Sequence, residues 1–152
     1  MDLISTLEQV FATNFEVYYR THVSHVNTVG RNFYSDHKLL QKIYEDLQDN
    51  IDTQAEFLRT LRTLMPQSLG IIQSLSATDD HEVAGSADQL LQGVYDDLEI
   101  MIDLYQQLNE VADDEAHDEI ANYAQDQMRN LRKFCWMIRA TLDGRIATED
   151  EY

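Results

Sequence analysis

Residues 22–57 read HVSHVNTVGRNFYSDHKLLQKIYEDLQDNIDTQAEF, which combines the end of one helix, a short turn and most of a second helix. Gly30 is suited to end the first helix, because glycine commonly follows the last helical residue. Ser35 is suited to cap the second helix, with Tyr34 able to pack against Leu39 across the cap. The apolar residues after this cap recur at helical spacing, and they are Leu40, Ile43, Leu47, Ile51 and Leu58. The stretch therefore predicts two consecutive antiparallel helices.

The sequence on either side extends this pattern to four long helices. The first helix covers residues 3 to 29, with apolar side chains at Leu3, Leu7, Val10, Phe11, Phe15, Tyr18, Val26 and Val29. Pro66 sets the latest end of the second helix and opens the longest connection, 66–80, in which QSLGIIQSL can form a short helix. The third helix has Ser86 and Gln89 as its cap and the apolar stripe Ala87, Leu90, Val94, Leu98, Met101, Tyr105 and Leu108. The fourth ends at Gly144, with the stripe Ala116, Ile120, Ala124, Leu131, Cys135, Ile138 and Leu142. The predicted fold is an all-α bundle.

The composition indicates one globular domain. The chain has 152 residues, 43% of them apolar, and its single proline and five glycines favour long helices over strands. No apolar run approaches the roughly 20 residues that a membrane span needs, and the start MDLISTLEQV has no secretion-signal pattern. Cys135 is the only cysteine, so an internal disulfide framework is excluded. We expect a single domain over residues 1–152, a loose acidic tail at 145–152, no membrane association and a cytoplasmic location.

The charge is strongly negative, at −17 from 28 acidic and 11 basic residues. Such a surface repels phosphate backbones, because nucleic-acid binding depends on lysine and arginine neutralising them. It attracts cations instead. Two interpretations stay open at this point: a charge that serves solubility or a salty environment, and a charge that gathers metal ions. We expect no direct binding to DNA.

A polar stripe runs along the second helix and consists of His37, Gln41, Asp52 and Glu56, which fall within about 100° of arc on a regular helix. His37 and Asp52 are about 22 Å apart along such a helix, whereas metal–ligand bonds are only about 2 Å long. One chain therefore cannot place both on one ion through this helix alone. A second, antiparallel copy related by a two-fold axis could do so, and would create two equal sites. A solvated helix face is the alternative, and His25, on the first helix, is by itself more typical of a hydrogen-bonded interior residue.

Residues 22–57 resemble the characteristic motif of the Dps (DNA-protection-during-starvation) family of mini-ferritins. That motif has two histidines three apart, a turn with glycine, an aromatic pair, a histidine that opens the next helix, and an Asp and a Glu four apart. KFCWMIRATL, at 133–142, resembles the family's fourth-helix ending. The resemblance covers nearly the whole chain. It implies a ferritin-like four-helix bundle with a short helix between helices two and three, and a homo-oligomer, a hollow dodecamer built from two-fold dimers.

The resemblance also implies a ferroxidase. Ferrous iron would be oxidised by hydrogen peroxide or oxygen at inter-subunit sites and stored as ferric mineral, which protects against oxidative damage. Carried over by position, His25 and His37 come from one subunit, and Asp52 and Glu56 from its partner. Glu56 then bridges toward a second metal, and zinc is a conceivable substitute for iron.

Some positions depart from the family pattern. Gln41 stands where an aspartate is usual, and a neutral amide is a weaker ligand for a hard cation. The alternative of a non-catalytic or weakly catalytic metal-binding shell therefore stays open. Val26 stands where a tryptophan is usual, so radical protection would fall to an aromatic residue that could equally be core: Tyr18, Tyr19, Tyr44 or Trp136. Many family members bind DNA through a lysine-rich terminal tail, whereas here the first basic residue is Arg20 and the C-terminal end is acidic. The candidates for access pores are Asp113, Asp114, Asp118 and Asp126.

Two other classes of protein remain as alternatives. A di-metal enzyme with its site inside one bundle needs Glu-x-x-His on two helices, and the sequence contains no Glu-x-x-His. An acidic helical adaptor without metal is the other, and a small, metal-free species in solution would argue for it.

Overall fold

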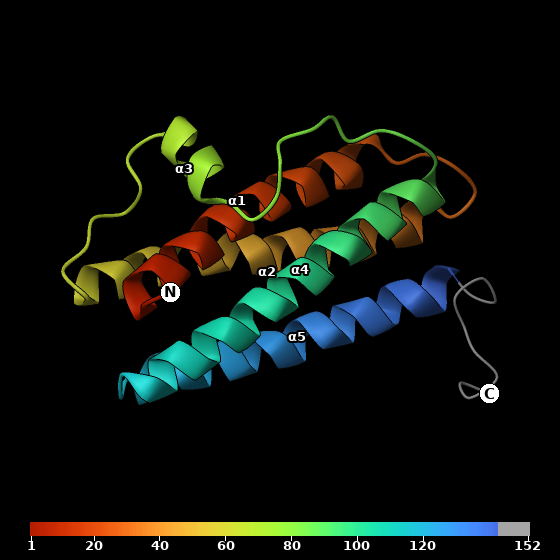
Figure 1. Cartoon of the computed structure of the whole chain (residues 1–152). Helices are drawn as coiled ribbons and strands as arrows, with labels where there is room; N and C mark the ends of the chain where they lie inside the picture. The colour runs from red at the N-terminus through yellow and green to blue at the C-terminus, as the bar shows by residue number, and fades with distance from the viewer. Residues whose placement is uncertain (143–152) are drawn as a thin grey trace.

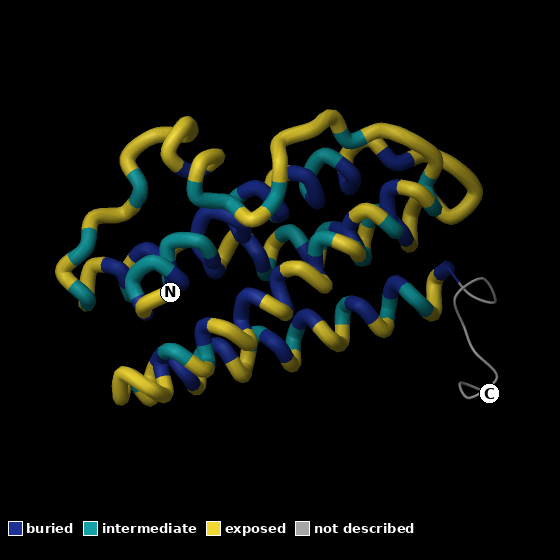
Figure 2. Tube along the Cα trace, viewed as in Figure 1, coloured by how far each residue is buried: buried dark blue, intermediate teal, exposed yellow. Residues whose placement is uncertain are grey.

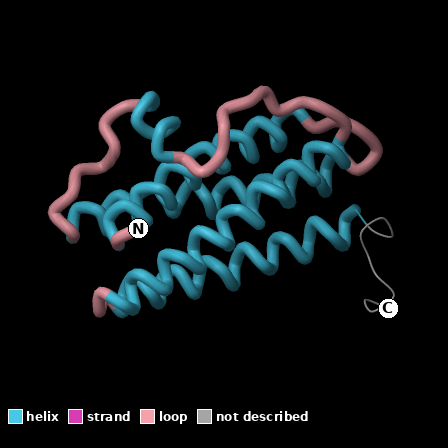
Figure 3. The backbone as a smooth tube through the Cα atoms, in the orientation of Figure 1, coloured by secondary structure: helices cyan, strands magenta, loops and turns pink. Residues whose placement is uncertain are grey.

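The computed structural model describes residues 1–142, which form helices and loops without any strand (Figures 1 and 3). In chain order the helices are α1 Leu3–Asn27, α2 Phe33–Thr60, α3 Leu69–Leu75, α4 Ala87–Asp114 and α5 Asp118–Leu142. The four long helices make a bundle, and α3 lies on its outside in the connection between α2 and α4 (Figure 1). The predicted all-α bundle with a short helix in the long connection is confirmed. Gly144 and the acidic tail at 145–152 lie outside the described residues.

The core is built where the predicted apolar stripes face each other. α1 packs against α2, α4 and α3, and α4 packs against α5, and each long helix is buried on one side and exposed on the other (Figure 2). Phe11, Leu40, Leu98 and Ile138 are fully buried, and side chains of this size each stabilise the fold by about 1.5–3 kcal/mol. The end of the predicted first stripe was wrong. Val26 is 62% exposed because it faces out on the last turn of α1, and Val29 is also exposed because it follows the end of the helix.

The start of α4 has the cap that the sequence predicts. The Ser86 hydroxyl accepts from the Gln89 backbone N–H (3.2 Å), while the Gln89 side chain accepts from the Ser86 backbone N–H (2.9 Å). Gly85 precedes this capping box with φ +134°, and a Cβ there would lie 2.6 Å from Gln89 Oε1. The reciprocal cap therefore depends on glycine at position 85.

The cap predicted for the second helix was wrong. α2 begins at Phe33, with Asn32 at the N-cap position and without a side-chain cap. Gly30 has φ +125°, so the chain turns immediately and the Phe33 backbone N–H donates to the Gly30 carbonyl (3.1 Å). Ser35 lies inside the first turn, where its hydroxyl donates to the Asn32 carbonyl. The left-handed conformation at Gly30 thus starts the helix two residues before the best capping side chain.

The turn between α4 and α5 also differs from the prediction. Ala116 is exposed in this turn with φ +61°, so it belongs neither to α5 nor to the core stripe. The His117 backbone N–H donates to the Ala112 carbonyl (2.8 Å) and closes the end of α4. The Glu115 carboxylate accepts from the Leu3 backbone N–H (2.8 Å), which attaches the start of α1 to this turn.

A polar network that sequence patterns did not reveal joins α2, α4 and α5 inside the bundle. The buried Gln54 side chain donates to the Tyr105 hydroxyl (2.7 Å) and to the Tyr123 hydroxyl (3.1 Å). Tyr123 in turn donates to Asn50 Oδ1 (2.5 Å). Burial raises the pKa of Tyr105 and of Tyr123 above the usual value, so both hydroxyls stay protonated. The network links the three helices through neutral groups, and Gln54 Oε1 is its buried atom that has no hydrogen-bond partner among the described residues.

Candidate metal centre

Two histidines from consecutive helices lie face to face where α1 ends and α2 begins. The rings of His25 and His37 are stacked, with centroids 3.8 Å apart and planes 14° apart. His25 Nδ1 lies 2.7 Å from the His37 carbonyl, and His37 Nδ1 lies 2.8 Å from the His25 carbonyl. The short turn after Gly30 brings the helices together here, and the reciprocal hydrogen bonds hold the pair.

These hydrogen bonds decide which ring nitrogen can bind a metal. A carbonyl oxygen only accepts, so Nδ1 of each ring must carry the proton and donate. In the neutral imidazole the lone pair then lies on Nε2, which is left for a metal ion. Burial lowers the pKa of His25 below its usual value. The hydrogen bond to the His37 carbonyl acts in the opposite direction, and the nearby His37 and His22 side chains lower this pKa further. His25 is therefore held in the neutral form that a metal requires. Its hydrogen-bonded interior position, expected from the sequence, is compatible with ligation.

Aromatic rings surround this histidine pair. The Tyr44 ring lies 5.0 Å from His25 and stacks on His22 at 4.1 Å. The Tyr18 hydroxyl lies 3.0 Å from His22 Nδ1, and the Phe33 ring lies 4.9 Å from His37. Of the four aromatic residues proposed from the sequence for radical protection, Tyr44 lies beside the candidate ligand His25, whereas Tyr18 contacts His22 and Tyr44. Tyr19 and Trp136 are 63% and 55% exposed.

The two carboxylates of the stripe lie on the distant part of α2. Asp52 and Glu56 are exposed and one turn apart. Because α2 is uninterrupted from Phe33 to Thr60, Asp52 stays about 22 Å from His37 along the helix. Within residues 1–142, no group of three or more His, Cys, Asp or Glu residues is placed to hold a metal ion. Within one chain the pair of histidines and the pair of carboxylates therefore lie apart.

Gln41 is engaged by a neighbouring carboxylate that sequence reasoning missed. Its side-chain Nε2 donates to Glu45 Oε1 at 2.8 Å, one helical turn further along α2. Glu45 also raises the pKa of His25 slightly against the larger effect of burial, so its charge acts on the histidine pair. Helical spacing could have shown Glu45, since it lies two turns after His37 on the same side.

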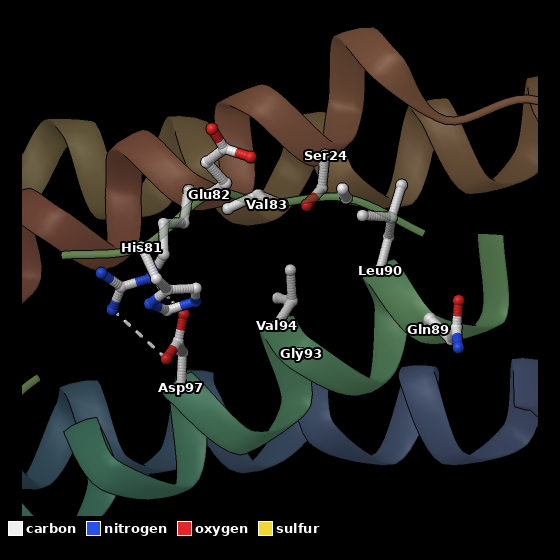
Figure 4. Close-up of a pocket in the computed structure, with 11 residues that line it drawn as sticks. Ser24, His81, Glu82, Val83, Gln89, Leu90, Gly93, Val94 and Asp97 are labelled. Carbon is white, nitrogen blue, oxygen red and sulfur yellow. Dashed lines mark hydrogen bonds and ion pairs between the residues drawn. The ribbon is translucent and has the colours of Figure 1, made fainter. Parts of the chain in front are cut away.

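Other polar groups outside the stripe have structural partners. Arg20, 5% exposed, donates from Nε to Asp97 (2.9 Å) and from Nη2 to the Thr78 hydroxyl (2.9 Å), and it pairs with Glu16 (3.4 Å). A pocket of about 160 Å³ adjoins this ion pair, and its lining includes His81 from the long connection and Asp97 from α4 (Figure 4). These contacts attach the connection to the bundle.

A second, larger hollow of about 650 Å³ lies between α1, α3 and the connection, and its lining is mainly apolar: Phe15, Tyr19, Val23, Leu69, Ile72 and Val83.

Within residues 1–142, no helix combines the length and apolar character needed to cross a membrane. The candidate pore residues Asp113, Asp114, Asp118 and Asp126 are all exposed. Asp126 pairs with Arg129 at 3.3 Å, and the assignment of these residues to pores stays a prediction.

Comparison with known proteins gives consistent matches over nearly the whole chain. The profile of the ferritin-like domain family matches residues 4–145. A DNA protection during starvation protein from Brevibacillus brevis is 30% identical over 132 residues, covering 84% of this chain and 85% of that protein. One from Helicobacter pylori is 24% identical over 143 residues, covering 93% of this chain and 99% of that protein. A Dps protein structure from Vibrio cholerae, described as a member of a broad superfamily of ferritin-like diiron-carboxylate proteins, superposes with a TM-score of 0.87. It is 26% identical and covers 93% of this chain and 89% of that one.

Proposed function

The chain belongs to the ferritin-like domain family and within it to the Dps proteins, and from this premise we propose that it is a ferroxidase mini-ferritin. An iron-binding function follows from the family. Beyond it, the proposal is that ferrous iron is oxidised between subunits, by hydrogen peroxide or oxygen, and stored as ferric mineral in a dodecameric shell. His25 and His37 of one subunit would bind the iron together with Asp52 and Glu56 of the partner subunit.

The observation that carries this proposal is the separation of the half-sites along α2. The histidine pair has both Nδ1 atoms engaged by carbonyls and so offers Nε2. The exposed carboxylates of Asp52 and Glu56 are the ligand type that complements imidazole at an iron site. Because about 22 Å of helix separates the two groups, a two-fold dimer with antiparallel α2 helices is the arrangement that would unite them.

Apolar side chains around the histidine pair support a subunit contact at this place. Val26 and Val29 are 62% and 72% exposed, and Phe33 and Tyr34 are 40% and 73% exposed. Large apolar side chains grouped in this way are typical of surfaces that a partner covers. A second copy would remove them from water while delivering its carboxylates.

The chemistry follows from the ligand set. Two ferrous ions held side by side could each give one electron to one peroxide, which forms water rather than a hydroxyl radical. Neutral imidazole and ionised carboxylate are both available near pH 7. A shell of twelve chains, each with a net charge of −17, would carry roughly 200 negative charges, enough to draw cations inward.

A weakly catalytic or non-catalytic metal-binding shell is the second candidate. Gln41 favours it, because a neutral amide that already donates to Glu45 is a poor substitute for an aspartate ligand. Adding ferrous iron without oxygen and then adding peroxide distinguishes the two candidates. A rise in ferric absorbance is expected from the ferroxidase and not from the scaffold.

Subunit complementation tests the inter-subunit site. One chain carries His37→Ala and the other carries Glu56→Gln, and each variant alone should lose most of its ferroxidase activity. In a mixed dimer one site contains both defects, while the other combines His37 and the partner's intact Glu56. In a shell assembled from equal amounts of the two co-expressed chains and isolated by two different tags, random pairing makes about half of the dimers mixed. Each mixed dimer has one intact site of two, so about a quarter of the wild-type activity should be recovered.

Outcomes without recovery count against the proposal. Mixed dimers that stay inactive would place both residues in one chain's site, or outside the site. A fully active monomer would also contradict it. As a control, Asp49→Asn changes an exposed carboxylate on α2 outside the stripe and should leave the activity unchanged.

We further expect no DNA mobility shift at physiological salt, since the charge of the chain is −17.

A further inference from the structure

A carboxylate that belongs to none of the ligands proposed so far lies near the histidine pair of the same chain. Glu45 is exposed on α2, and its Oε1 atom accepts from Gln41 Nε2 at 2.8 Å. Burial lowers the pKa of His25, and the charge of Glu45 acts on the same ring in the opposite direction. Interactions between exposed charges are largely screened beyond about 10 Å, so Glu45 lies close to this ring.

The side chain of Glu45 is directed toward the histidines. Side chains on a helix tilt toward its N-terminus, and His37 lies on that side of Glu45, about 12 Å away along the axis. The hydrogen bond to Gln41 has this direction, since Gln41 lies one turn closer to His37. Glu45 is also about 80° from His37 around the helix, within the arc of the polar stripe. Its carboxylate is therefore part of the surface that the partner subunit would cover.

The charge of Glu45 is not neutralised by a basic side chain. None of the ion pairs within residues 1–142 involves Glu45, and its contact with Gln41 is a hydrogen bond from a neutral amide. A carboxylate that accepts one such bond keeps its charge and has further lone pairs for a cation. Gln41 thus orients the carboxylate, as hydrogen-bonding partners commonly orient metal ligands.

We propose that Glu45 is the carboxylate ligand of the second iron position in this chain, and that Gln41 is its positioning residue. The inference rests on the proposed inter-subunit site. Ferritin-like sites for two metal ions inside one bundle use four carboxylates and two histidines. The proposed site has the two histidines but only the carboxylates of Asp52 and Glu56. Glu45 adds a third carboxylate where Gln41 cannot supply one.

The two-fold arrangement agrees with this role. Glu45 lies near the midpoint of α2 between His37 and Asp52, so pairing His37 with Asp52 of the partner subunit brings Glu45 of both chains toward the axis. Like charges that meet in an interface oppose association, and a cation on each carboxylate would remove this repulsion. The tilt of the side chain assigns each Glu45 to the site that contains the histidines of its own chain.

Anaerobic titration with ferrous ion, followed by calorimetry, counts bound ions without any turnover. The wild-type protein should bind about two ferrous ions tightly per chain, and Glu45→Gln about one, since a two-fold dimer has two equal sites. Glu110→Gln is the matched control, because Gln106 donates to Glu110 in the same one-turn arrangement on α4 (3.2 Å). It should bind like the wild type. Both variants lose one negative charge, so weak binding elsewhere on the acidic surface changes equally.

A rescue separates ligation from a structural role. Gln41→Asp in the Glu45→Gln background places a carboxylate one turn closer to His37 and should restore the second ion. Gln41→Asn in the same background shortens the side chain equally without adding a charge and should restore nothing. Circular dichroism of each variant checks that the helical content is intact.

The outcomes distinguish this inference from the proposed function. Loss of tight binding in His37→Ala, together with wild-type binding in Glu45→Gln, would keep the inter-subunit site and overturn the role of Glu45. A wild-type protein that binds a single ion per chain, or an equal loss in Glu110→Gln, would overturn it as well. A wild-type protein without any tight ferrous binding would contradict the proposed function, and this inference with it.

Discussion

Gln41 donates its side-chain amide to the Glu45 carboxylate one helical turn away, with 2.8 Å between Nε2 and Oε1. This pair occupies the position where the family resemblance would place a ligand aspartate next to His37. The Glu45 carboxylate is therefore present near this position, although the aspartate expected from the resemblance is missing. Whether the second metal position functions depends on whether Gln41 or Glu45 binds the ion.

Replacing Gln41 by aspartate should strengthen this metal position. The variant Gln41→Asp supplies a charged oxygen ligand in place of an amide, and we expect ferrous binding tighter by about tenfold, about 1.4 kcal/mol, with faster oxidation. Anaerobic titration and stopped-flow absorbance measure the two effects. Gln107→Asp, an exposed change of the same chemistry on α4, is the control. Identical affinity and rate for Gln41→Asp and wild type would exclude this role for Gln41.

Removing His25 should weaken metal binding. Its Nε2 is left for the ion because Nδ1 donates to the His37 carbonyl, and burial lowers its pKa. We expect His25→Ala to reduce ferrous affinity at pH 7 by about 10–100-fold, the range typical of perturbed metal shells. Because the pKa is lowered, wild-type binding should persist when the pH falls to about 6.5 and weaken only at lower pH. His81→Ala removes an exposed histidine and should have no effect on the titration.

Asp46 should make stability depend on pH. Its Oδ2 atom is buried and has no hydrogen-bond partner among the described residues, and burial, followed by Asp49, raises the pKa of Asp46 from 3.8 to about 6. The folded state then binds more protons than the unfolded state between these values, so stability falls as pH rises from about 4 to 6 and stays lower above. Asp46→Asn removes the charge and should raise the melting temperature at pH 7.5 by about 2–4 °C. At pH 4 the same variant should differ little from wild type, and an equal shift at both pH values would contradict this account.

Arg20 should be a major source of stability for the long connection. Arg20→Leu would leave the Asp97 and Glu16 carboxylates without their buried guanidinium, and breaking a buried pair in this way costs about 3–5 kcal/mol. Denaturant unfolding measures the loss, and hydrogen exchange should increase at residues 76–78, which Arg20 contacts through Thr78. Arg59→Leu, at an exposed arginine, should change stability by less than about 1 kcal/mol. Similar losses in the two variants would argue against this role.

The sequence predicts the fold because the spacing of the apolar residues and the capping residues indicate the same helices. Apolar residues such as Leu98 and Leu131 recur at helical spacing and are buried, and Ser86 and Gln89 form the predicted cap. The failures are local. Ser35 is not the cap because Gly30 adopts a left-handed conformation. Ala116 lies outside the helix because it also has a positive φ. A residue's φ depends on the packing around it, so spacing alone does not reveal it.

The candidate site was only partly predictable. Helix geometry showed from the sequence alone that His37 and Asp52 cannot share an ion in one chain, and the uninterrupted α2 helix agrees. The pairing of His25 with His37 came from the family resemblance, because it depends on how the turn between two helices closes. The reciprocal carbonyl hydrogen bonds of the two histidines are three-dimensional features that no spacing rule contains. The contact of Gln41 with Glu45, in contrast, follows the spacing of one helical turn.

Gly85 limits which mutations this gene can accumulate. A codon change to alanine would be harmless in most loops, but here the added methyl group would collide with Gln89 and the backbone would also be strained at φ +134°. The first turn of α4 would lose the half of its cap in which the Gln89 side chain accepts from the Ser86 backbone N–H. We would expect glycine to persist at this position in descendants of the protein while the rest of the exposed connection varies.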